Sequence, residues 1–253
     1  MIEKIYEIYR LIINNELILT FSSVIQTLGS FSIAAFGLYF IFQKIGYKII
    51  ALYTIHSDSL SITRISEIVL INKKNQPVVI NSIEAIFDKK YRLELEKFHS
   101  PLILKPLESI HITTEPISNT YLEGEKYEIP YYDRNRIEIQ IISVNKRIKC
   151  KLLNKKRKIF FPKKIKYISI KKISKIFNNI VYSDQIMFAI VYSYNSIEHT
   201  AFVHKNGIIT GDWIFKYNMI PNNYLISEKT ISYYIDSLKL GKSNFNFSVE
   251  ELN

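Results

Sequence analysis

One segment near the N-terminus constrains this chain more than any other. From Leu17 to Phe42 the sequence runs for 26 residues without a charged side chain. About 20 apolar residues wound as an α-helix cross the hydrocarbon core of a bilayer. We therefore predict a transmembrane helix over residues 17–45. A buried core helix and a cleavable signal peptide are the alternatives, and the signal peptide fits poorly because three glutamates precede the run.

The residues before this run have a different pattern. Between residues 1 and 16, apolar side chains follow the i, i+3, i+4, i+7 spacing of an amphipathic helix, beginning with Ile2, Ile5 and Tyr6. Charged side chains occupy the other face. We expect Asn14-Asn15 to interrupt this helix before the span begins.

Small and polar side chains recur at three- and four-residue steps along the predicted span and therefore share one face. They are Ser22, Gln26, Gly29, Ser30, Ala34 and Gly37. In lipid, small residues allow helices to approach closely, and a glutamine amide finds a partner on a neighbouring helix. The stripe predicts self-association or docking to another membrane protein. The alternative is that a tilted helix simply tolerates small residues.

Orientation follows from the charges that flank the span. Lys44, Lys48 and Arg64 follow it, whereas two basic residues precede it. Because basic residues favour the cytoplasmic side, we expect a cytoplasmic C-terminal part and a single pass through the cell inner membrane. Cys150 is the sole cysteine, so the chain has no intrachain disulfide, as is typical of a reducing compartment.

Beyond the span the period of the apolar pattern changes from helix-like to strand-like. Over residues 46–165, short runs such as Ile68–Ile71 and Val78–Ile80 alternate with turn signals at spacings near ten residues. Many short strands at such spacings are typical of a sandwich or barrel. The fold class that we predict is an N-terminal transmembrane α-helix plus a mainly-β soluble part, a β-sandwich, followed by an α+β C-terminal lobe over 166–253.

The C-terminal lobe mixes helix and strand signals. We expect a short helix over 168–180, a hairpin of strands 186–194 and 197–204, a strand over 207–215 and a closing helix over 227–240. Asn195-Ser196 and Asn206-Gly207 supply turns. Ser227 is a plausible N-cap of the closing helix, and Gly241 stands where a C′ residue is expected.

The segments 68–87 (IVLINKKNQPVVINSIEAIF) and 101–112 (PLILKPLESIHI) carry a resemblance. In both the strand-turn-strand pattern around Asn72–Val78 and the later Leu104, Pro106 and Ser109, the chain resembles small immunoglobulin-like domains of uncharacterised, membrane-anchored bacterial proteins. The resemblance covers roughly residues 62–118. It implies an immunoglobulin-like fold and no particular activity.

The positive charge of the chain is concentrated in one block. Of 34 basic residues, 14 lie between Lys146 and Lys175, a stretch that contains no acidic residue. The rest of the chain contains 20 basic and 23 acidic residues, so the positive excess lies in this block. The predicted anion-binding residues are Lys155, Lys156, Arg157, Lys158, Lys163, Lys164 and Lys166. A solvated face, anionic lipid and nucleic acid are the three interpretations. A membrane tether favours anionic lipid or an acidic partner over nucleic acid.

Catalytic motifs do not emerge. The seven glycines form no phosphate-binding loop, and no pair among the five histidines has helical metal spacing. His199 and His204 are five residues apart on a predicted strand, hence on opposite faces. Cys150 stands among cations without a nearby histidine, and Asp212-Trp213 is interpreted as a turn followed by a core aromatic. We therefore expect no enzyme, no cofactor and no metal.

Two hypotheses follow. The first is a membrane-anchored interaction or assembly protein that self-associates or docks through its helix and presents a β module, as in a bacterial defence or toxin-like system. The alternative is a membrane-tethered enzyme or nucleic-acid-processing subunit using His199, His204 and Asp212.

Overall fold

The computed structural model of the chain describes residues 2–133, 136–144, 146–152, 167–221, 225–238 and 245–252. Within these residues the chain forms two helices and 17 strands: α1 (Ile2–Lys44), β1 (Ile49–His56), β2 (Arg64–Asn72), β3 (Val78–Phe87), β4 (Tyr91–Leu104), β5 (Ser109–Thr113), β6 (Asn119–Leu122), β7 (Glu125–Lys126), β8 (Ile137–Ser143), β9 (Lys146–Lys149), β10 (Lys151–Leu152), β11 (Ile168–Ile173), β12 (Lys175–Phe177), β13 (Ile180–Tyr182), β14 (Ile186–Tyr194), β15 (Ile197–His204), β16 (Ile209–Gly211), α2 (Glu228–Ser237) and β17 (Phe245–Glu251). A long apolar helix thus precedes a mainly-β region that includes one small helix.

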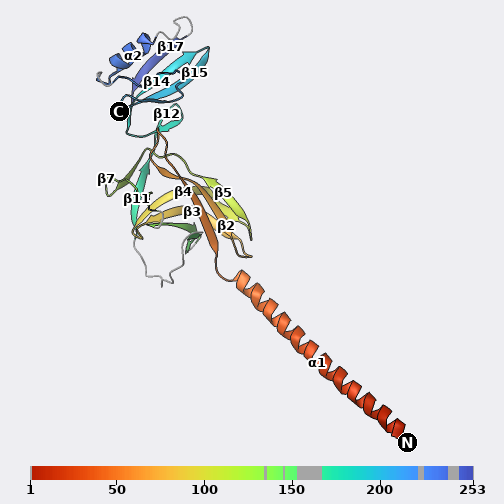
Figure 1. Ribbon diagram of the computed structural model, residues 1–253. Helices are drawn as coiled ribbons and strands as arrows, with labels where there is room; N and C mark the ends of the chain where they lie inside the picture. The colour runs from red at the N-terminus through yellow and green to blue at the C-terminus, as the bar shows by residue number, and fades with distance from the viewer. Residues whose placement is uncertain are drawn as a thin grey trace.

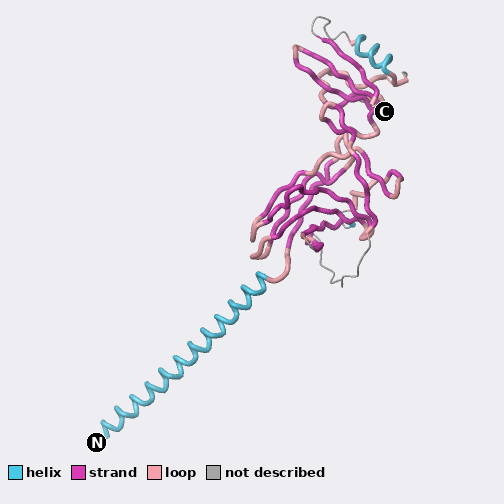
Figure 2. Tube along the Cα trace, turned by 180° about the vertical axis from the view of Figure 1, so that it is seen from behind, coloured by secondary structure: helices cyan, strands magenta, loops and turns pink. Residues whose placement is uncertain are grey.

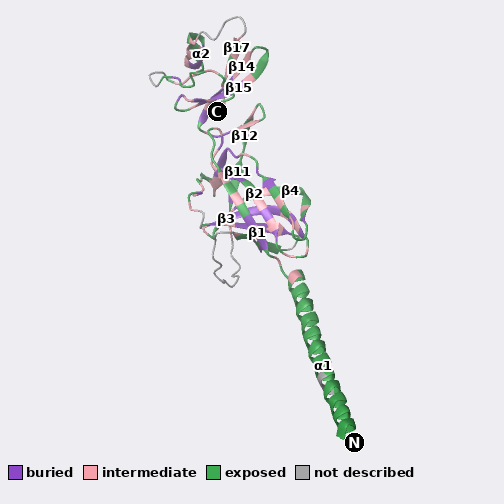
Figure 3. Cartoon of the chain, turned by 45° about the vertical axis from the view of Figure 1, so that its right-hand side comes forward, coloured by how far each residue is buried: buried purple, intermediate pink, exposed green. Residues whose placement is uncertain are grey.

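Helix α1 projects away from the rest of the molecule (Figure 1). Its 43 residues correspond to a length of about 65 Å. Apolar side chains along it are exposed, including Phe31 at 73% and Ile33 at 75% (Figure 3). The expected interruption at Asn14-Asn15 is wrong, because α1 runs through both residues. An asparagine in a helix interior costs about 0.5 kcal/mol relative to alanine. Two of them therefore do not end a long helix.

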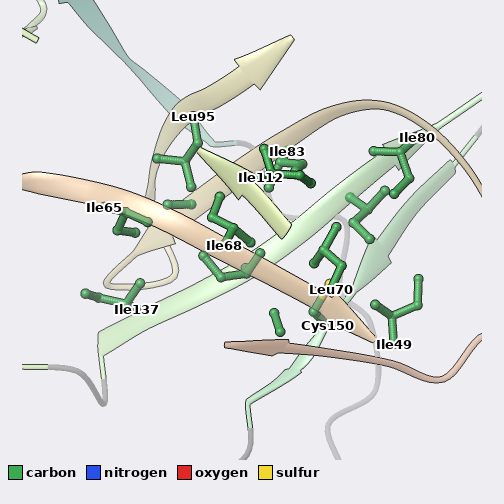
Figure 4. Packing of buried hydrophobic residues seen from close by; sticks show 14 of the residues in the cluster. Ile49, Ile65, Ile68, Leu70, Ile80, Ile83, Leu95, Ile112, Ile137 and Cys150 are labelled. Carbon is green, nitrogen blue, oxygen red and sulfur yellow. The ribbon is translucent and has the colours of Figure 1, made fainter. Parts of the chain in front are cut away.

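The first β unit comprises β1 to β11 and contains two sheets that share one hydrophobic core (Figure 4). One sheet has the strand order β10-β1-β2-β5 and the other β7-β6-β11-β4-β3-β8-β9. Ile68 and Leu70 of β2 and Ile83 of β3 are fully buried in this core. Burial alternates along the second half of β2, where Ile68 and Leu70 are buried and Val69 and Ile71 are half-buried, because successive side chains of a strand point to opposite faces.

The turn between β2 and β3 contacts the C-terminal end of α1. The backbone N–H of Asn75 donates to the Gln43 carbonyl oxygen at 3.2 Å, and the Lys74 ammonium donates to the Phe42 carbonyl oxygen. The Gln76 amide donates to the carbonyl oxygen of Gly46. These donors satisfy carbonyl groups that a helix end leaves without partners. The helix end is therefore held by the β unit.

A second turn, between β4 and β5, lies beside the first. The N–H of Leu107 donates to the Lys74 carbonyl oxygen at 3.3 Å. Leu107 follows Pro106 and has a φ of 57°, a conformation that costs a non-glycine residue about 1–2 kcal/mol. Its side chain is nevertheless 68% exposed. The leucine therefore gains little from packing against the described parts of the chain.

The predicted helix over 168–180 is wrong. Residues 168–173 form β11, which pairs in parallel with β4 and antiparallel with β6. Residues 175–182 form the β12–β13 hairpin, whose loop residues Asn178 and Asn179 have φ of 46° and 62°. A short apolar run is ambiguous between helix and strand, and here the open position beside β4 favours the strand. Although it lies beyond residue 165, β11 thus belongs to a sheet of the first β unit.

The C-terminal unit comprises β12 to β17 and α2. Its sheet has the order β16-β15-β14-β17, and the predicted hairpin about Asn195-Ser196 is confirmed as β14–β15. Ile231 and Ile235 bury one side of α2 against this sheet. Ser227 is confirmed as the N-cap, with its hydroxyl accepting from the Thr230 N–H at 3.3 Å.

Two boundaries in this unit differ from expectation. The helix ends at Ser237, and Gly241 lies outside the described residues. Of the strand expected over 207–215, only β16 forms, because the chain turns at Gly211, after which Trp213 and Phe215 pack against the core of this unit. Gly207 has a φ of 83°, and a Cβ there would lie 2.9 Å from the Ile220 carbonyl oxygen, so the turn requires glycine.

Candidate functional site

The predicted packing face lies on one uninterrupted helix. All six of its residues are in α1, so their three- and four-residue spacing places them on one side. The Ser22 and Ser30 hydroxyls each donate to a backbone carbonyl of α1 at 2.8 Å. A Cβ added at Gly29 or Gly37 would meet nothing within 4 Å. Packing within the described chain therefore gives no reason for glycine at either position.

The polar side chains on this face remain open to an outside partner. Gln26 is exposed, and within the described residues its side-chain amide makes no hydrogen bond. Serine hydroxyls that bond to their own helix remain able to accept one further hydrogen bond. The face thus combines room for close approach with one free amide. This is the chemistry that favours helix–helix contact in lipid.

The predicted anion-binding residues, 155–158, 163, 164 and 166, lie outside the described residues. Five of the described cations flanking them bind within the chain. Lys149 pairs with Glu138 at 2.5 Å, Lys175 with Asp184 at 2.8 Å, and Arg147 with Glu84 at 3.9 Å. The ammonium groups of Lys172 and Lys146 contact a carbonyl oxygen of Leu95 and the ring of Tyr47. Most of the described cations that flank the basic block are therefore paired within the chain.

Two residues of the alternative hypothesis lie together. His199 Nδ1 lies 2.6 Å from Asp212 Oδ2, and the imidazole ring stacks on Tyr192 with 4.9 Å between centroids. The Tyr192 hydroxyl donates to the Asp212 carbonyl oxygen at 2.6 Å. An aspartate holding a histidine is one component of many acid–base sites. The pair lies at the edge of an aromatic cluster that includes Trp213 and Phe215.

The third residue, His204, lies elsewhere. His204 and His199 are five residues apart on β15 and therefore lie on opposite faces of the strand. The Nε2 atom of His204 lies 3.0 Å from Thr210 Oγ1. Burial lowers the pKa of His204, which favours the neutral imidazole. Trp213 is confirmed as an aromatic anchor, because it packs against Tyr192 and donates its indole N–H to the Tyr217 carbonyl oxygen at 2.8 Å. The structure therefore joins His199 with Asp212 and separates both from His204.

A polar cavity that no sequence pattern predicted lies where the two β units meet. It has a volume of about 450 Å³ and is lined by residues of the segments 57–63, 119–120, 126–131 and 183–185 together with His204. Serine, threonine and tyrosine hydroxyls predominate among these side chains. They come from turns far apart in the sequence, so no motif predicted them.

Charges around the cavity are balanced within the chain. Asp58 accepts from the N–H of Leu60 at 2.9 Å and pairs with Arg64 at 3.2 Å. Asp184 pairs with Lys175 at 2.8 Å and Lys126 at 3.3 Å. Burial raises the pKa of Asp184, but these hydrogen-bonded cations outweigh it and hold the pKa at about 2.

A buried carboxylate in the larger sheet also escaped prediction. Glu84 of β3 is 5% exposed, and burial raises its pKa despite Arg92 at 3.5 Å and Arg147 at 3.9 Å. The sequence signal was a lone glutamate inside the apolar run of β3. No three His, Cys, Asp or Glu side chains are grouped as metal ligands in the described ranges.

Comparisons of the chain with protein-family models, curated proteins and solved structures found no match. The geometry described above is therefore the basis for the functional argument.

Proposed function

We propose that this chain is a single-pass membrane-anchored interaction protein, which assembles through α1 and presents its β units to a partner. The observation that carries this proposal is an apolar helix long enough to cross a bilayer, none of whose most apolar stretch is buried. A soluble chain would cover such a surface, because large exposed apolar areas favour association. Lipid covers it in this proposal.

The contacts at the end of α1 support its retention as an anchor. A signal sequence is removed after translocation, and its removal here would eliminate the acceptors of the β2–β3 turn at Phe42 and Gln43. A helix that contributes hydrogen bonds to the neighbouring β unit is more consistent with a permanent span. A buried core helix does not fit, because none of the most apolar stretch is buried.

The β units serve as the presented module. Two sheets sharing one core support the interpretation of the first unit as an immunoglobulin-like β-sandwich. Such folds host many unrelated interactions, so the fold alone names no partner. With Lys44 and Lys48 directly after the span, these units lie in the cytoplasm at the cell inner membrane.

Assembly is assigned to the face defined by Ser22, Gln26, Gly29, Ser30, Ala34 and Gly37. A clustered helix of this kind suits a bacterial defence or toxin-like effector that acts at its own membrane. The basic residues 155–166 contact anionic lipid or an acidic partner in this proposal. The two serines and Gln26 supply hydrogen bonds between helices, each worth about 1–2 kcal/mol.

The test compares two double variants of the full chain in mild detergent by light scattering after size exclusion. Gln26→Leu with Ser30→Leu removes polar groups from the face, and we expect association to weaken about ten-fold or more. Ser32→Leu with Ala35→Leu changes two small residues on the opposite side of α1 and leaves the mass unchanged. An unchanged oligomer in the first variant, or a monomeric parent chain with no companion protein, argues against assembly through this face.

The second candidate function is a membrane-tethered enzyme in the C-terminal unit. The 2.6 Å contact between His199 and Asp212 is the observation that favours it. If an activity of the chain survives the combined change of His199, His204 and Asp212 to alanine, this candidate is eliminated.

A further inference from the structure

We propose that the β unit itself has a membrane-contacting surface, which we call the membrane-proximal surface. It is formed by the end of α1 and two turns, and its residues are Lys44, Ile45, Lys48, Lys73, Lys74, Lys105 and Leu107. Its partner is the headgroup layer of an anionic bilayer. The inference rests on the proposed function, since it requires that α1 span the membrane.

Hydrogen bonds determine where this surface lies. The Lys74 ammonium contacts the carbonyl oxygen of Phe42, the last apolar residue of the uncharged run. The N–H of Lys73 donates to the Lys48 carbonyl oxygen at 2.9 Å. Because the uncharged run occupies the hydrocarbon core, its last apolar residue lies at the headgroup level. The β2–β3 turn is therefore at that level too.

The second turn is tied to the first. Buried Asn72 bridges them, with its Nδ2 donating to the carbonyl oxygens of Gln76 at 2.7 Å and Lys105 at 3.1 Å. The N–H of Leu107 donates to the Lys74 carbonyl oxygen. Figure 2 shows loops of the β unit gathered beside the end of α1. Both turns thus reach the bilayer together.

The charge of these segments matches anionic lipid. Segments 42–48, 72–77 and 105–108 contain five lysines and one carboxylate, Glu108. That carboxylate accepts a hydrogen bond from the Lys105 N–H at 2.9 Å. The side chains of Lys44, Lys48, Lys73 and Lys105 are exposed. Lysines at the surface of an anionic leaflet are attracted to it, and their aliphatic stems extend along apolar surface.

Leu107 supplies an apolar contact at the centre of this charge. It occupies the position of a type II turn where glycine or asparagine is usual, and it exposes its side chain. Ile45, 62% exposed, directly follows α1. An exposed leucine close to Lys74 and Lys105 has the composition of an interfacial membrane anchor. Contact with lipid explains why a leucine occupies this strained position.

The membrane-proximal surface also sets the orientation of the C-terminal unit. The C-terminal unit lies at the opposite end of the first β unit from α1 (Figures 1 and 2). Three contacts with the bilayer, namely α1 and the two turns, would hold the β unit in one orientation. The C-terminal unit is then presented away from the membrane.

The experiment uses the full chain in vesicles of phosphatidylcholine with phosphatidylglycerol. An environment-sensitive dye is attached to a cysteine at one of three positions, and quenching by spin-labelled lipid is measured. Leu107→Cys reports the proposed contact, Leu28→Cys reports the span, and Leu225→Cys, 85% exposed in the C-terminal unit, reports solvent. We expect quenching at 107 at least about two-fold above that at 225.

A charge-reversal pair provides the matched control. Lys73→Glu with Lys105→Glu should lower quenching at 107 about two-fold or more in anionic vesicles, whereas Lys205→Glu with Lys216→Glu should not. Quenching at 28 together with a solvent-like signal at 107 overturns this inference and leaves the proposed span intact. A solvent-like signal at 28 overturns both. Equal quenching at 107 in pure phosphatidylcholine, insensitive to charge reversal, overturns the assignment to anionic lipid.

Discussion

The backbone N–H of Asn75 lies 3.2 Å from the carbonyl oxygen of Gln43, one residue before the end of α1. This bond joins a β-turn to the C-terminus of a helix across 32 residues of sequence. Next to Asn75, Lys74 places a cation at the negative end of the helix dipole. The helix and the β unit therefore meet through specific hydrogen bonds as well as through the short connecting segment.

Asn72 is expected to be the most sensitive polar residue at this junction. It is 1% exposed, donates two hydrogen bonds and accepts a third from the Lys74 N–H at 3.0 Å. Asn72→Ala should lower the free energy of unfolding by about 2–3 kcal/mol, because it removes three part-buried hydrogen bonds and leaves a cavity at a buried position. Asn75→Ala, at an exposed side chain, should change it by less than about 0.5 kcal/mol. Thermal unfolding in detergent, followed by circular dichroism, measures both, and equal effects would contradict the assigned role.

Alanine substitutions at Gly124 and Gly207 distinguish the cost of backbone strain from the cost of a steric clash. Both have positive φ, but only at Gly207 would a Cβ collide, with the Ile220 carbonyl oxygen. Gly124→Ala should cost about 1–2 kcal/mol from strain alone. Gly207→Ala should cost more, because the turn that precedes β16 must also shift. Tryptophan fluorescence of Trp213, in the C-terminal core, should report the loss in the second variant. Equal stability of the two variants would argue against the clash.

Asp184 makes stability depend on acid pH. Its folded pKa of about 2 lies below its ordinary value of 3.8, so its ionised form contributes stability above about pH 4, which is lost as the pH falls toward 2. Asp184→Asn should cost about 1 kcal/mol at neutral pH, since Lys126 is exposed and solvent screens the pair. The difference between parent and variant should shrink between pH 4 and pH 2. Urea unfolding at several pH values measures it, and a constant difference would contradict the pKa assignment.

Cys150 is expected to be unreactive in the folded chain. Burial raises the pKa of its thiol to about 12, so at pH 8 only about one thiol in ten thousand is ionised. Labelling by an aromatic disulfide reagent should be at least about 100-fold slower than in guanidinium. A Leu225→Cys variant should gain one fast-reacting thiol. Rapid labelling of the parent chain would show that the core around Cys150 opens readily.

Local patterns predicted the elements whose stability is mainly local. The apolar helix followed from an uncharged run, and the β14–β15 hairpin from Asn195-Ser196 between alternating strands. The N-cap at Ser227 was equally readable, since capping depends on residues within one turn. The β12–β13 hairpin carried a comparable signal in Asn178-Asn179, which the apolar spacing of the neighbouring isoleucines concealed.

The sequence by itself determined a long apolar helix, a mainly-β remainder and the face of α1 that holds Gln26, because helical and strand periods are local properties of the chain. Only the tertiary structure decided that β11 joins a sheet beside β4, that His199 meets Asp212, and that two turns meet the end of α1. Each of these pairings joins residues that are distant in sequence or separated by a turn. Their partners are chosen by burial and hydrogen-bond satisfaction across the whole fold, which no local pattern encodes.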